Sequence, residues 1–162
     1  MKNNYVKKVD LVMWTKNGAK TLPRVLRRIE KVIPNTYINN KIVVDDHSTD
    51  GTREIARGFG WSIYLNPKEG IGFGANEALK YVETEYFASV KQDVLLSSDW
   101  WVKITRHMAN RDVVVAQGIR LFSNDVLRKL DTTYSAQNLN PYSIDNNLIS
   151  HAISFGDWWF SN

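Results

Sequence analysis

The sequence predicts an α/β fold in which helices cover both faces of a mostly parallel central sheet. Short runs of β-forming residues alternate with helical periods along most of the chain, and turn residues separate them. Alternation of this kind is typical of strand–helix–strand units, whose helices cross back over the sheet. At 162 residues the chain is long enough for one domain with a substantial core, and no linker composition marks a second domain.

The expected elements follow one another with few interruptions. Strands are predicted over residues 9–14, 41–45, 61–65, 86–91 and 112–116. Helices are predicted over 19–33, with one apolar stripe, over 52–57 behind N-cap residues, over 75–84, and after Ser98. Beyond residue 118 the rhythm weakens, and we expect a helix over 124–130, a polar loop over 131–142 and a helix over 143–155.

Composition narrows the classes of function. The chain has no cysteine, which excludes disulfides and thiolate metal sites and favours a reduced, cytoplasmic compartment. No apolar run is long enough to cross a bilayer. The formal net charge of +4 fits an anionic ligand or a membrane surface, but it is too small to indicate a nucleic acid partner.

Residues 70–75 have the spacing Gly-x-Gly-x-x-Ala of a loose dinucleotide fingerprint. Asp93 follows about twenty residues later, at the end of the next predicted strand, where a ribose-binding acid belongs. The pattern supports a Rossmann-type NAD(P)-dependent oxidoreductase that uses the loop at 70–74. However, this loop follows the third predicted strand rather than the first, and residues 66–69 separate the two. The glycines could instead cradle a phosphate together with Lys68, or form a plain turn.

A second candidate site lies in the segment VVDDHSTDGT, residues 43–52. Asp45 and Asp46 stand side by side at the carboxyl end of a predicted strand, where two like charges are costly to hold together. A carboxylate there can accept hydrogen bonds from a base N–H or from ribose hydroxyls. The structural alternative is that Asp45 caps the loop backbone while Asp46 is solvated.

Two further features each allow two interpretations. Five basic residues share one face of the first predicted helix, which suits anionic lipid headgroups as well as an ordinary solvated face: Lys20, Arg24, Arg27, Arg28 and Lys31. The tryptophan pairs at 100–101 and 158–159 suit sugar stacking as well as a buried aromatic core. The three histidines are scattered, and no HExxH, Gly-x-Ser-x-Gly or Walker pattern is present.

Several motifs, in order, resemble those of glycosyltransferase family 2, whose members have the GT-A fold, a Rossmann-like three-layer sandwich. The segment VVDDHSTDGT is similar to the family's Val-Asp-Asp-Gly-Ser-Thr-Asp-Gly-Thr, and only His47 departs. VMWTKNGAKTLPRVL keeps Thr15 and Asn17 of the family's opening Pro-Thr-Tyr-Asn pattern, and NPKEGIGFGANEAL keeps Gly70 and Asn76 of its glycine-containing loop. YFASVKQDVLLSSDWW lines up with the family's DxD strand, and IDNNLISHAISFG with its catalytic helix.

The resemblance implies inverting transfer of a sugar from a UDP- or GDP-type nucleotide sugar to a hydroxyl of a glycan or lipid-linked acceptor. Asp145 would be the general base, and Asp93 would bind Mg²⁺ or Mn²⁺ at the diphosphate. The implied nucleotide-sugar contacts are Thr15, Asn17, Asp45, Asp46, Gly70, Asn76, Lys91 and Gln92. The protein would act in glycan biosynthesis, in the cytoplasm or peripheral to the inner face of the membrane.

Three departures from the family's pattern matter. Lys91 stands at the first acid of the DxD motif, His151 replaces an arginine on the catalytic helix, and family members usually continue beyond that helix. We therefore expect residues 1–162 to be a single catalytic domain, either a minimal enzyme or the catalytic part of a longer protein. Lys91 leads to two hypotheses. In the first, its ammonium partly replaces the metal's charge at the diphosphate and so weakens metal dependence. In the second, catalysis has been lost and a nucleotide-binding role remains.

Overall fold

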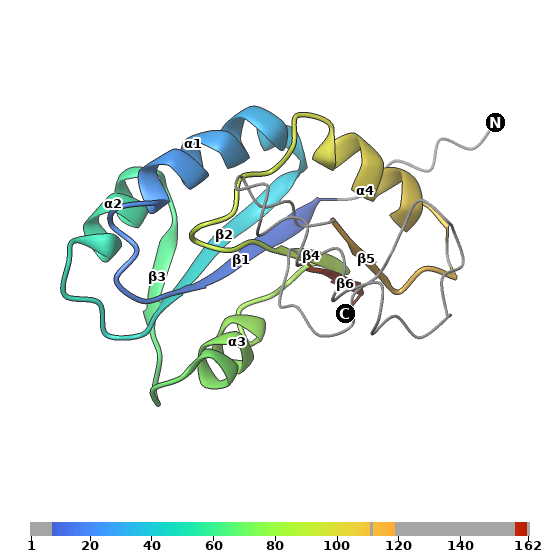
Figure 1. The fold of residues 1–162 in the computed structure, drawn as a ribbon. Helices are drawn as coiled ribbons and strands as arrows, with labels where there is room; N and C mark the ends of the chain where they lie inside the picture. Colours follow the sequence, from blue (N-terminus) through green and yellow to red (C-terminus); the bar gives the residue numbers. More distant parts are fainter. Residues whose placement is uncertain (1–7, 111, 119–157, 162) are drawn as a thin grey trace, which may run out of the picture.

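The structure, a computed structural model, describes residues 8–110, 112–118 and 158–161, and the statements below concern those residues. They form a six-stranded sheet of order β3-β2-β1-β4-β6-β5 (Figure 1). The strands are β1 (Val9–Thr15), β2 (Ile38–Asp45), β3 (Ser62–Leu65), β4 (Tyr86–Ser89), β5 (Val115–Gln117) and β6 (Trp158–Ser161). The helices are α1 (Leu22–Val32), the short 3₁₀ helix Asn35–Tyr37, α2 (Thr52–Gly58), α3 (Ile71–Leu79) and α4 (Trp100–Met108).

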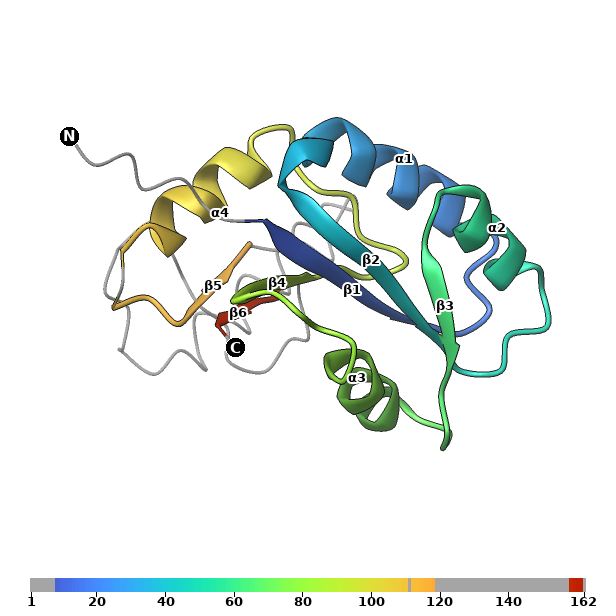
Figure 2. The ribbon, with the colours of Figure 1, turned by 180° about the vertical axis from the view of Figure 1, so that it is seen from behind.

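The sheet is mostly parallel, as predicted. The pairs β1–β2, β2–β3 and β1–β4 are parallel, whereas β6 runs antiparallel to both β4 and β5. Helices α1, α2 and α4 lie over one face of the sheet and α3 lies over the other, as the views from the front and from behind agree (Figures 1 and 2). The predicted three-layer arrangement with helices on both faces is confirmed.

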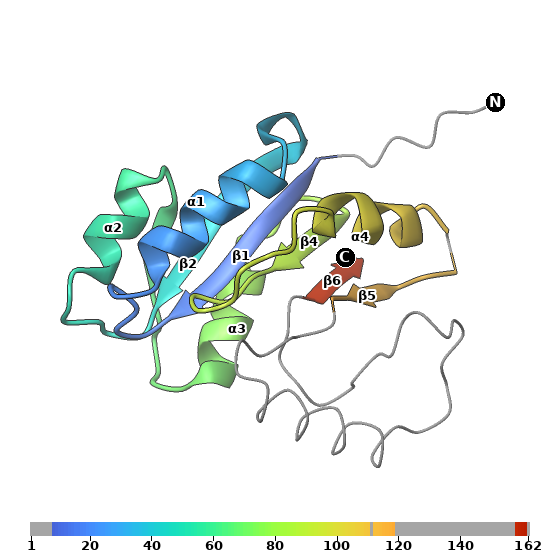
Figure 3. The same ribbon diagram turned by 45° about the horizontal axis from the view of Figure 1, so that its top comes forward.

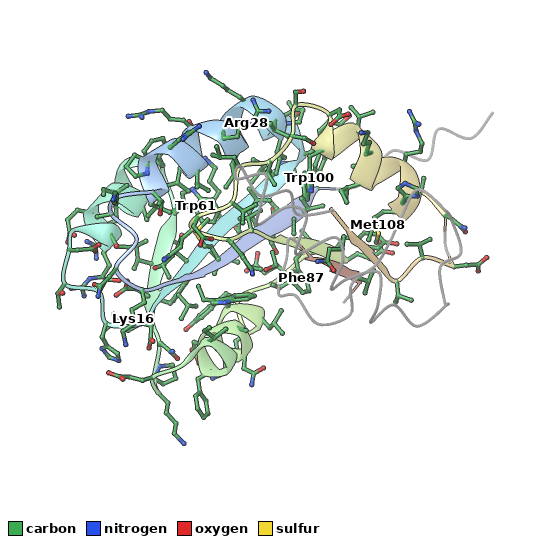
Figure 4. All side chains as sticks on the ribbon, viewed as in Figure 1. Lys16, Arg28, Trp61, Phe87, Trp100 and Met108 are labelled. Carbon is green, nitrogen blue, oxygen red and sulfur yellow. The ribbon has the colours of Figure 1, made fainter. Side chains whose placement is uncertain are left out.

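Strand β1 contributes to the core on both faces of the sheet, because its side chains alternate between the two faces. Leu11 and Met13 belong to a large cluster with the buried face of α1, whose predicted stripe Leu22, Leu26, Ile29 and Ile33 is fully buried. Val12 belongs to a smaller cluster with Ala78 of α3. Figure 4 marks Trp61, Trp100 and Met108 in the large cluster and Phe87 in the small one.

The structure resolves one of the alternatives left open by the sequence and describes the residues of a second. Trp100 and Trp101 are buried in the large cluster, so this pair is aromatic core rather than a sugar-stacking platform. In the basic face of α1, Arg28 is half-buried, and its Nε donates to the carbonyl of Leu96 at 2.6 Å (Figure 4). The four remaining basic residues of that face are exposed: Lys20, Arg24, Arg27 and Lys31.

Several predicted boundaries are wrong. Helix α3 begins at Ile71 rather than at residue 75, because only Gly70 leaves the helical region (φ 120°) and the next two glycines continue the helix. It also ends at Leu79 rather than at 84. Strand β4 ends at Ser89, and β5 covers Val115–Gln117 instead of 112–116.

Strand β6 was not predicted. It lies between β4 and β5, which Figure 3 shows clearly. The predicted elements over 124–130, 131–142 and 143–155 lie outside the described residues. Among the helices that are described, none has the length and apolar composition needed to span a bilayer.

Candidate functional site

The carboxyl ends of the parallel strands meet at one edge of the sheet, where a pocket of about 320 Å³ opens. In open α/β sheets this edge is the usual place for a ligand. Four segments line the pocket: the end of β1 with Lys16, which Figure 4 labels at this edge, Asp46 after β2, the β3–α3 connection, and the segment after β4. The β3–α3 region contributes Asn66, Gly70, Ile71 and Gly74.

The structure brings six of the predicted site residues together around this pocket: Thr15, Asp46, Gly70, Lys91, Gln92 and Asp93. Asn17, Asp45 and Asn76 do not line it. Asp145, with His151 and Gly156, lies outside the described residues. The pocket therefore contains the predicted donor-binding segments, whereas the predicted general base has no structural account.

Asp45 is fully buried below the pocket and holds the loop after β2. Its Oδ2 accepts the Ser48 N–H at 2.9 Å, its Oδ1 accepts the Thr15 hydroxyl at 3.4 Å, and the Arg53 Nε lies 3.7 Å from Oδ2. A buried carboxylate needs such partners to offset the loss of water. Asp45 thus caps the loop backbone, as the structural alternative predicted, and a direct contact with a nucleotide stays a prediction.

Asp46 faces the pocket, but it is not simply solvated as that alternative expected. Its Oδ1 accepts the Asn66 amide at 3.0 Å, while Oδ2 lies 3.3 Å from the Gly70 N–H and 3.4 Å from the Lys16 Nζ. Burial acts to raise the pKa of Asp46, but the donors from Asn66, Gly70 and Lys16 outweigh it and hold the pKa below its ordinary value. Asp46 is therefore ionised near neutral pH and keeps a partner on each oxygen.

Asn17 links two loops at the rim of the site. Its backbone N–H donates to the Ser48 hydroxyl at 2.8 Å, and its side-chain oxygen accepts the Thr49 N–H at 3.0 Å. Asn17 takes a left-handed backbone (φ 48°), as does His47 (φ 59°), and asparagine tolerates this region better than most residues. Asn17 shapes the loops and does not line the pocket.

The glycine segment does not have the geometry of a dinucleotide loop. Residues 66–70 connect β3 to α3, and among them only Gly70 has a positive φ. Its N–H donates to Asp46. Gly74 lies in the helix and allows α3 to approach β1, because a Cβ there would lie 3.2 Å from the Trp14 Cβ. Lys68 stacks on the Phe73 ring with its Nζ 4.5 Å from the ring centre, and it does not line the pocket. This arrangement argues against the oxidoreductase and the Lys68 phosphate cradle.

The segment after β4 brings Lys91, Gln92 and Asp93 to the pocket. Gln92 forms two hydrogen bonds to the backbone of Lys16: its Oε1 accepts the Lys16 N–H at 3.0 Å, and its Nε2 donates to the Lys16 carbonyl at 3.1 Å. Lys91 is half-buried and Asp93 is exposed. In the part of the chain that the structure describes, no three His, Cys, Asp or Glu side chains come together to hold a metal ion. The described residues alone therefore do not fit a divalent ion.

Two pocket residues with polar side chains were missed by sequence reasoning. Lys16 lies between Thr15 and Asn17, and its Nζ also lies 3.7 Å from Glu69. Asn66 is buried, and its amide connects Asp46 with the Gly70 carbonyl, at 3.0 and 3.2 Å. Their positions after the first and third strands were the signal available, because residues that follow parallel strands meet at one edge.

Comparisons with known proteins agree with this fold. Residues 10–160 match the model of Glycosyl transferase family 2. An uncharacterized glycosyltransferase of Rickettsia typhi is 30% identical over 148 residues, which are 85% of this chain and 46% of the relative. The chain spans about half the length of this relative.

Two solved structures share the fold. A mannosyltransferase from Pyrobaculum calidifontis, in complex with GDP-Man and Mn²⁺, is 21% identical with a TM-score of 0.65, over 72% of this chain and 36% of that one. Glucosyl-3-phosphoglycerate synthase from Mycobacterium tuberculosis, in complex with Mn²⁺, UDP-Glc and phosphoglyceric acid, is 15% identical with a TM-score of 0.72, over 96% and 57%. With the family match over nearly the whole chain, the conclusion is that this protein belongs to glycosyl transferase family 2 and has the GT-A fold.

Proposed function

We propose that the chain transfers a sugar from a UDP- or GDP-type nucleotide sugar to an acceptor hydroxyl, with inversion of configuration. The observation that carries this proposal is the pocket at the carboxyl edge of the sheet, which gathers Thr15, Asp46, Gly70 and the Lys91–Asp93 segment. The two solved relatives contain GDP-Man or UDP-Glc together with Mn²⁺, which supports this class of donor.

The donor's nucleoside would bind in the pocket at the carboxyl ends of β1 and β2. Asp46 is ionised and can accept a base N–H or a ribose hydroxyl on the side that faces the pocket. Asp45 and Asn17 would support donor binding indirectly. Their hydrogen bonds hold Ser48 and Thr49 of the loop after β2, the loop in which Asp46 lies. Asn76 is exposed on α3 and stays a predicted contact.

Sugar transfer needs a base and stabilisation of the leaving group. Asp145 would accept the acceptor's hydroxyl proton as that oxygen attacks the anomeric carbon. The bond between the anomeric carbon and the diphosphate oxygen breaks, and its electron pair leaves with the nucleoside diphosphate. Lys91, at the pocket wall, would stabilise the negative charge that develops on this leaving group.

Mg²⁺ or Mn²⁺ is a proposed cofactor because both relatives hold Mn²⁺ with their donors, and Lys91 would weaken the dependence on it. Asp93 is the exposed pocket acid that would ligate it. The other pocket acid, Asp46, is already engaged by Asn66, Gly70 and Lys16, so the described residues provide an incomplete ligand set.

The acceptor is proposed to be a glycan or a lipid-linked molecule. Four exposed cations, Lys20 just before α1 and Arg24, Arg27 and Lys31 within it, support a contact with anionic lipid headgroups. Such a contact would place the protein in the cytoplasm, peripheral to the inner face of the membrane.

A second candidate function is nucleotide binding without turnover. It is favoured by Lys91, which stands at the first acid of the DxD motif. In this case donor binding would persist and neither donor hydrolysis nor transfer would occur.

The proposal is tested by calorimetry with UDP, GDP, UDP-glucose, GDP-mannose, NAD⁺ and NADP⁺. We expect one diphosphate and its sugar nucleotide to bind at least about tenfold more tightly than either dinucleotide. Asp46→Asn should weaken that binding about tenfold or more, because it removes a charged acceptor. The control Glu54→Gln, on the exposed face of α2, should leave the affinity unchanged.

Turnover is measured with the donor that binds. Asp145→Asn should abolish donor hydrolysis and transfer while donor affinity stays within about twofold. Tighter binding of NAD(P) than of any nucleoside diphosphate would contradict the proposal. Affinity for the sugar nucleotide without any turnover by the unmodified chain would establish the second function instead.

A further inference from the structure

Two lysines reach the pocket from neighbouring strands. β1 and β4 are paired in parallel register up to Val12 and Ser89, and the Val90 N–H continues the pairing to the Val12 carbonyl at 3.0 Å. Lys16 follows the end of β1, Lys91 follows Val90, and both line the pocket. Because the two strands end at the same edge, the lysines belong to one wall of the site.

Gln92 ties the two segments that carry these lysines. Both functional groups of its amide bond to the backbone of Lys16, at 3.0 and 3.1 Å. The absence of a side chain at Gly18 leaves room for this amide, since a Cβ there would lie 2.7 Å from the Gln92 Oε1. The two bonds fix the backbone of Lys16 against the residue that follows Lys91.

The Lys16 ammonium is held only loosely. It lies 3.4 Å from Asp46 and 3.7 Å from Glu69, and the exposed fractions of the Lys16 and Glu69 side chains are 47% and 73%. Ion pairs between exposed groups are weak in water. Exchanging Glu69 for a phosphate oxygen would therefore cost little, and Lys16 could turn to an anion in the pocket without a change in the fold.

The charged side chains that line the pocket in the described part of the chain balance one another without a metal ion. Lys16 and Lys91 oppose Asp46 and Asp93, so these four side chains have no net charge. With an acid in place of Lys91 they would have a net charge of −2, and a diphosphate would then need a divalent ion to approach them. The lysine thus changes the local charge by the same amount that a divalent ion supplies.

We infer that Lys16 and Lys91 form a two-lysine diphosphate site, with Gln92 as the positioning residue, and that this site binds a nucleoside diphosphate without a divalent ion. The inference rests on the proposed function, in that the pocket must accept a nucleoside diphosphate. Ammonium groups bind phosphate as compact charges and need no fixed coordination geometry. Asp46 remains the acceptor for the nucleoside, and the two lysines take the phosphates.

The test is calorimetry with UDP and GDP, in EDTA and in Mn²⁺, on the full 162-residue chain. We expect the affinity of the unmodified chain for the better diphosphate to change by less than about threefold on chelation. Lys16→Met and Lys91→Met should each weaken diphosphate binding in EDTA about tenfold or more, by loss of a charge-assisted contact. The control is Lys68→Met, a lysine outside the pocket lining, which should change the affinity by less than about twofold.

Matched nucleosides separate a phosphate contact from a general effect on folding. Binding of uridine or guanosine should be unchanged in Lys91→Met, because Lys91 is not assigned to the nucleoside. In Lys16→Met it should weaken far less than diphosphate binding, because Asp46 keeps its Asn66 and Gly70 donors. Lys91→Glu should restore strong metal dependence, so that Mn²⁺ raises its diphosphate affinity about tenfold or more. Gln92→Ala should lower the affinity for the diphosphate and leave the affinity for the nucleoside unchanged.

Two results would overturn the inference while the proposed function stands. One is a loss of diphosphate affinity of more than about tenfold when the unmodified chain is placed in EDTA. The other is unchanged affinity in Lys16→Met. If neither UDP, GDP nor their sugar nucleotides bind with or without Mn²⁺, the proposed function and this inference both fail.

Discussion

The two edges of the same sheet each hold a carboxylate at a strand end, and the two carboxylates have very different partners. At the amino edge, Asp10 of β1 is fully buried and accepts the backbone N–H groups of Asn40, Glu83 and Thr84 at 2.9, 2.7 and 3.1 Å. The Asn39 amide adds a fourth donor at 3.0 Å. At the carboxyl edge, Asp46 is half-buried and shares its oxygens among Lys16, Asn66 and Gly70.

This difference separates a structural acid from an acid that can serve a ligand. The donors to Asp10 are mostly backbone groups of the start of β2 and of the α3–β4 connection, which the fold holds in place, so Asp10 joins these two segments and has no access to solvent. One donor to Asp46 is a flexible, half-exposed lysine beside an open pocket. The kind of donor, rather than burial or charge alone, thus distinguishes the two edges.

Asp10→Ala should have the largest effect on stability. The substitution leaves three backbone N–H groups and an amide without their acceptor, so we expect the free energy of unfolding to fall by about 3 kcal/mol. Urea denaturation followed by circular dichroism measures this change. Asp46→Ala should cost about 1 kcal/mol or less, since Lys16 and Gly70 are accessible to water and the buried Asn66 amide keeps the Gly70 carbonyl as an acceptor. A loss for Asp10→Ala as small as that for Asp46→Ala would break the comparison.

A pair of glycines in α3 tests how tightly the carboxyl edge is packed. Gly74→Ala places a Cβ 3.2 Å from the Trp14 Cβ, so we expect a loss of about 1–2 kcal/mol in the free energy of unfolding and weaker donor binding. Gly72→Ala meets no atom within 4 Å, and as the matched control it should stabilise the helix by up to about 1 kcal/mol. Equal effects of the two substitutions in thermal unfolding would show that α3 can move away from β1.

The smallest expected effect is on pH dependence. The pKa of Asp46 is lower in the folded protein than its ordinary value of 3.8, so the unfolded chain binds the proton more readily. The contribution of Asp46 to stability is therefore complete above pH 3.8 and is lost as the pH falls through the lower, folded pKa. Urea midpoints should fall more steeply with acid in the unmodified chain than in Asp46→Asn. Parallel curves of urea midpoint against pH for the two proteins would show that Asp46 does not contribute to the loss of stability in acid.

Local pattern was sufficient to predict the parallel sheet and the edge where the site lies. The apolar run before Asp45 predicts a buried strand, and polar residues after each strand mark the carboxyl edge. The different roles of Asp45 and Asp46 could not be read from their adjacency, because they depend on Ser48, Arg53 and Asn66 folding back. These contacts exist only in the tertiary structure.

Two further errors have identifiable physical causes. Glycine weakens helices, so the run at 70–74 was assigned to a loop. Gly74 nevertheless lies in α3, where the close approach to Trp14 leaves no room for a larger residue. Lys16 could not be predicted as a pocket residue because its position depends on Gln92, which lies 76 positions away along the chain.

Strand β6 has a consequence for how the protein is made. It follows β5 in the sequence but lies between β4 and β5 in space. While the ribosome is still adding residues before 158, β4 and β5 have already emerged with unpaired backbone groups, which are a template for strands of other chains. β6 can pair with β4 and β5 only after residues 158–161 have been synthesised. A nascent chain that stalls before this point would need protection by a chaperone, and prematurely terminated products should aggregate.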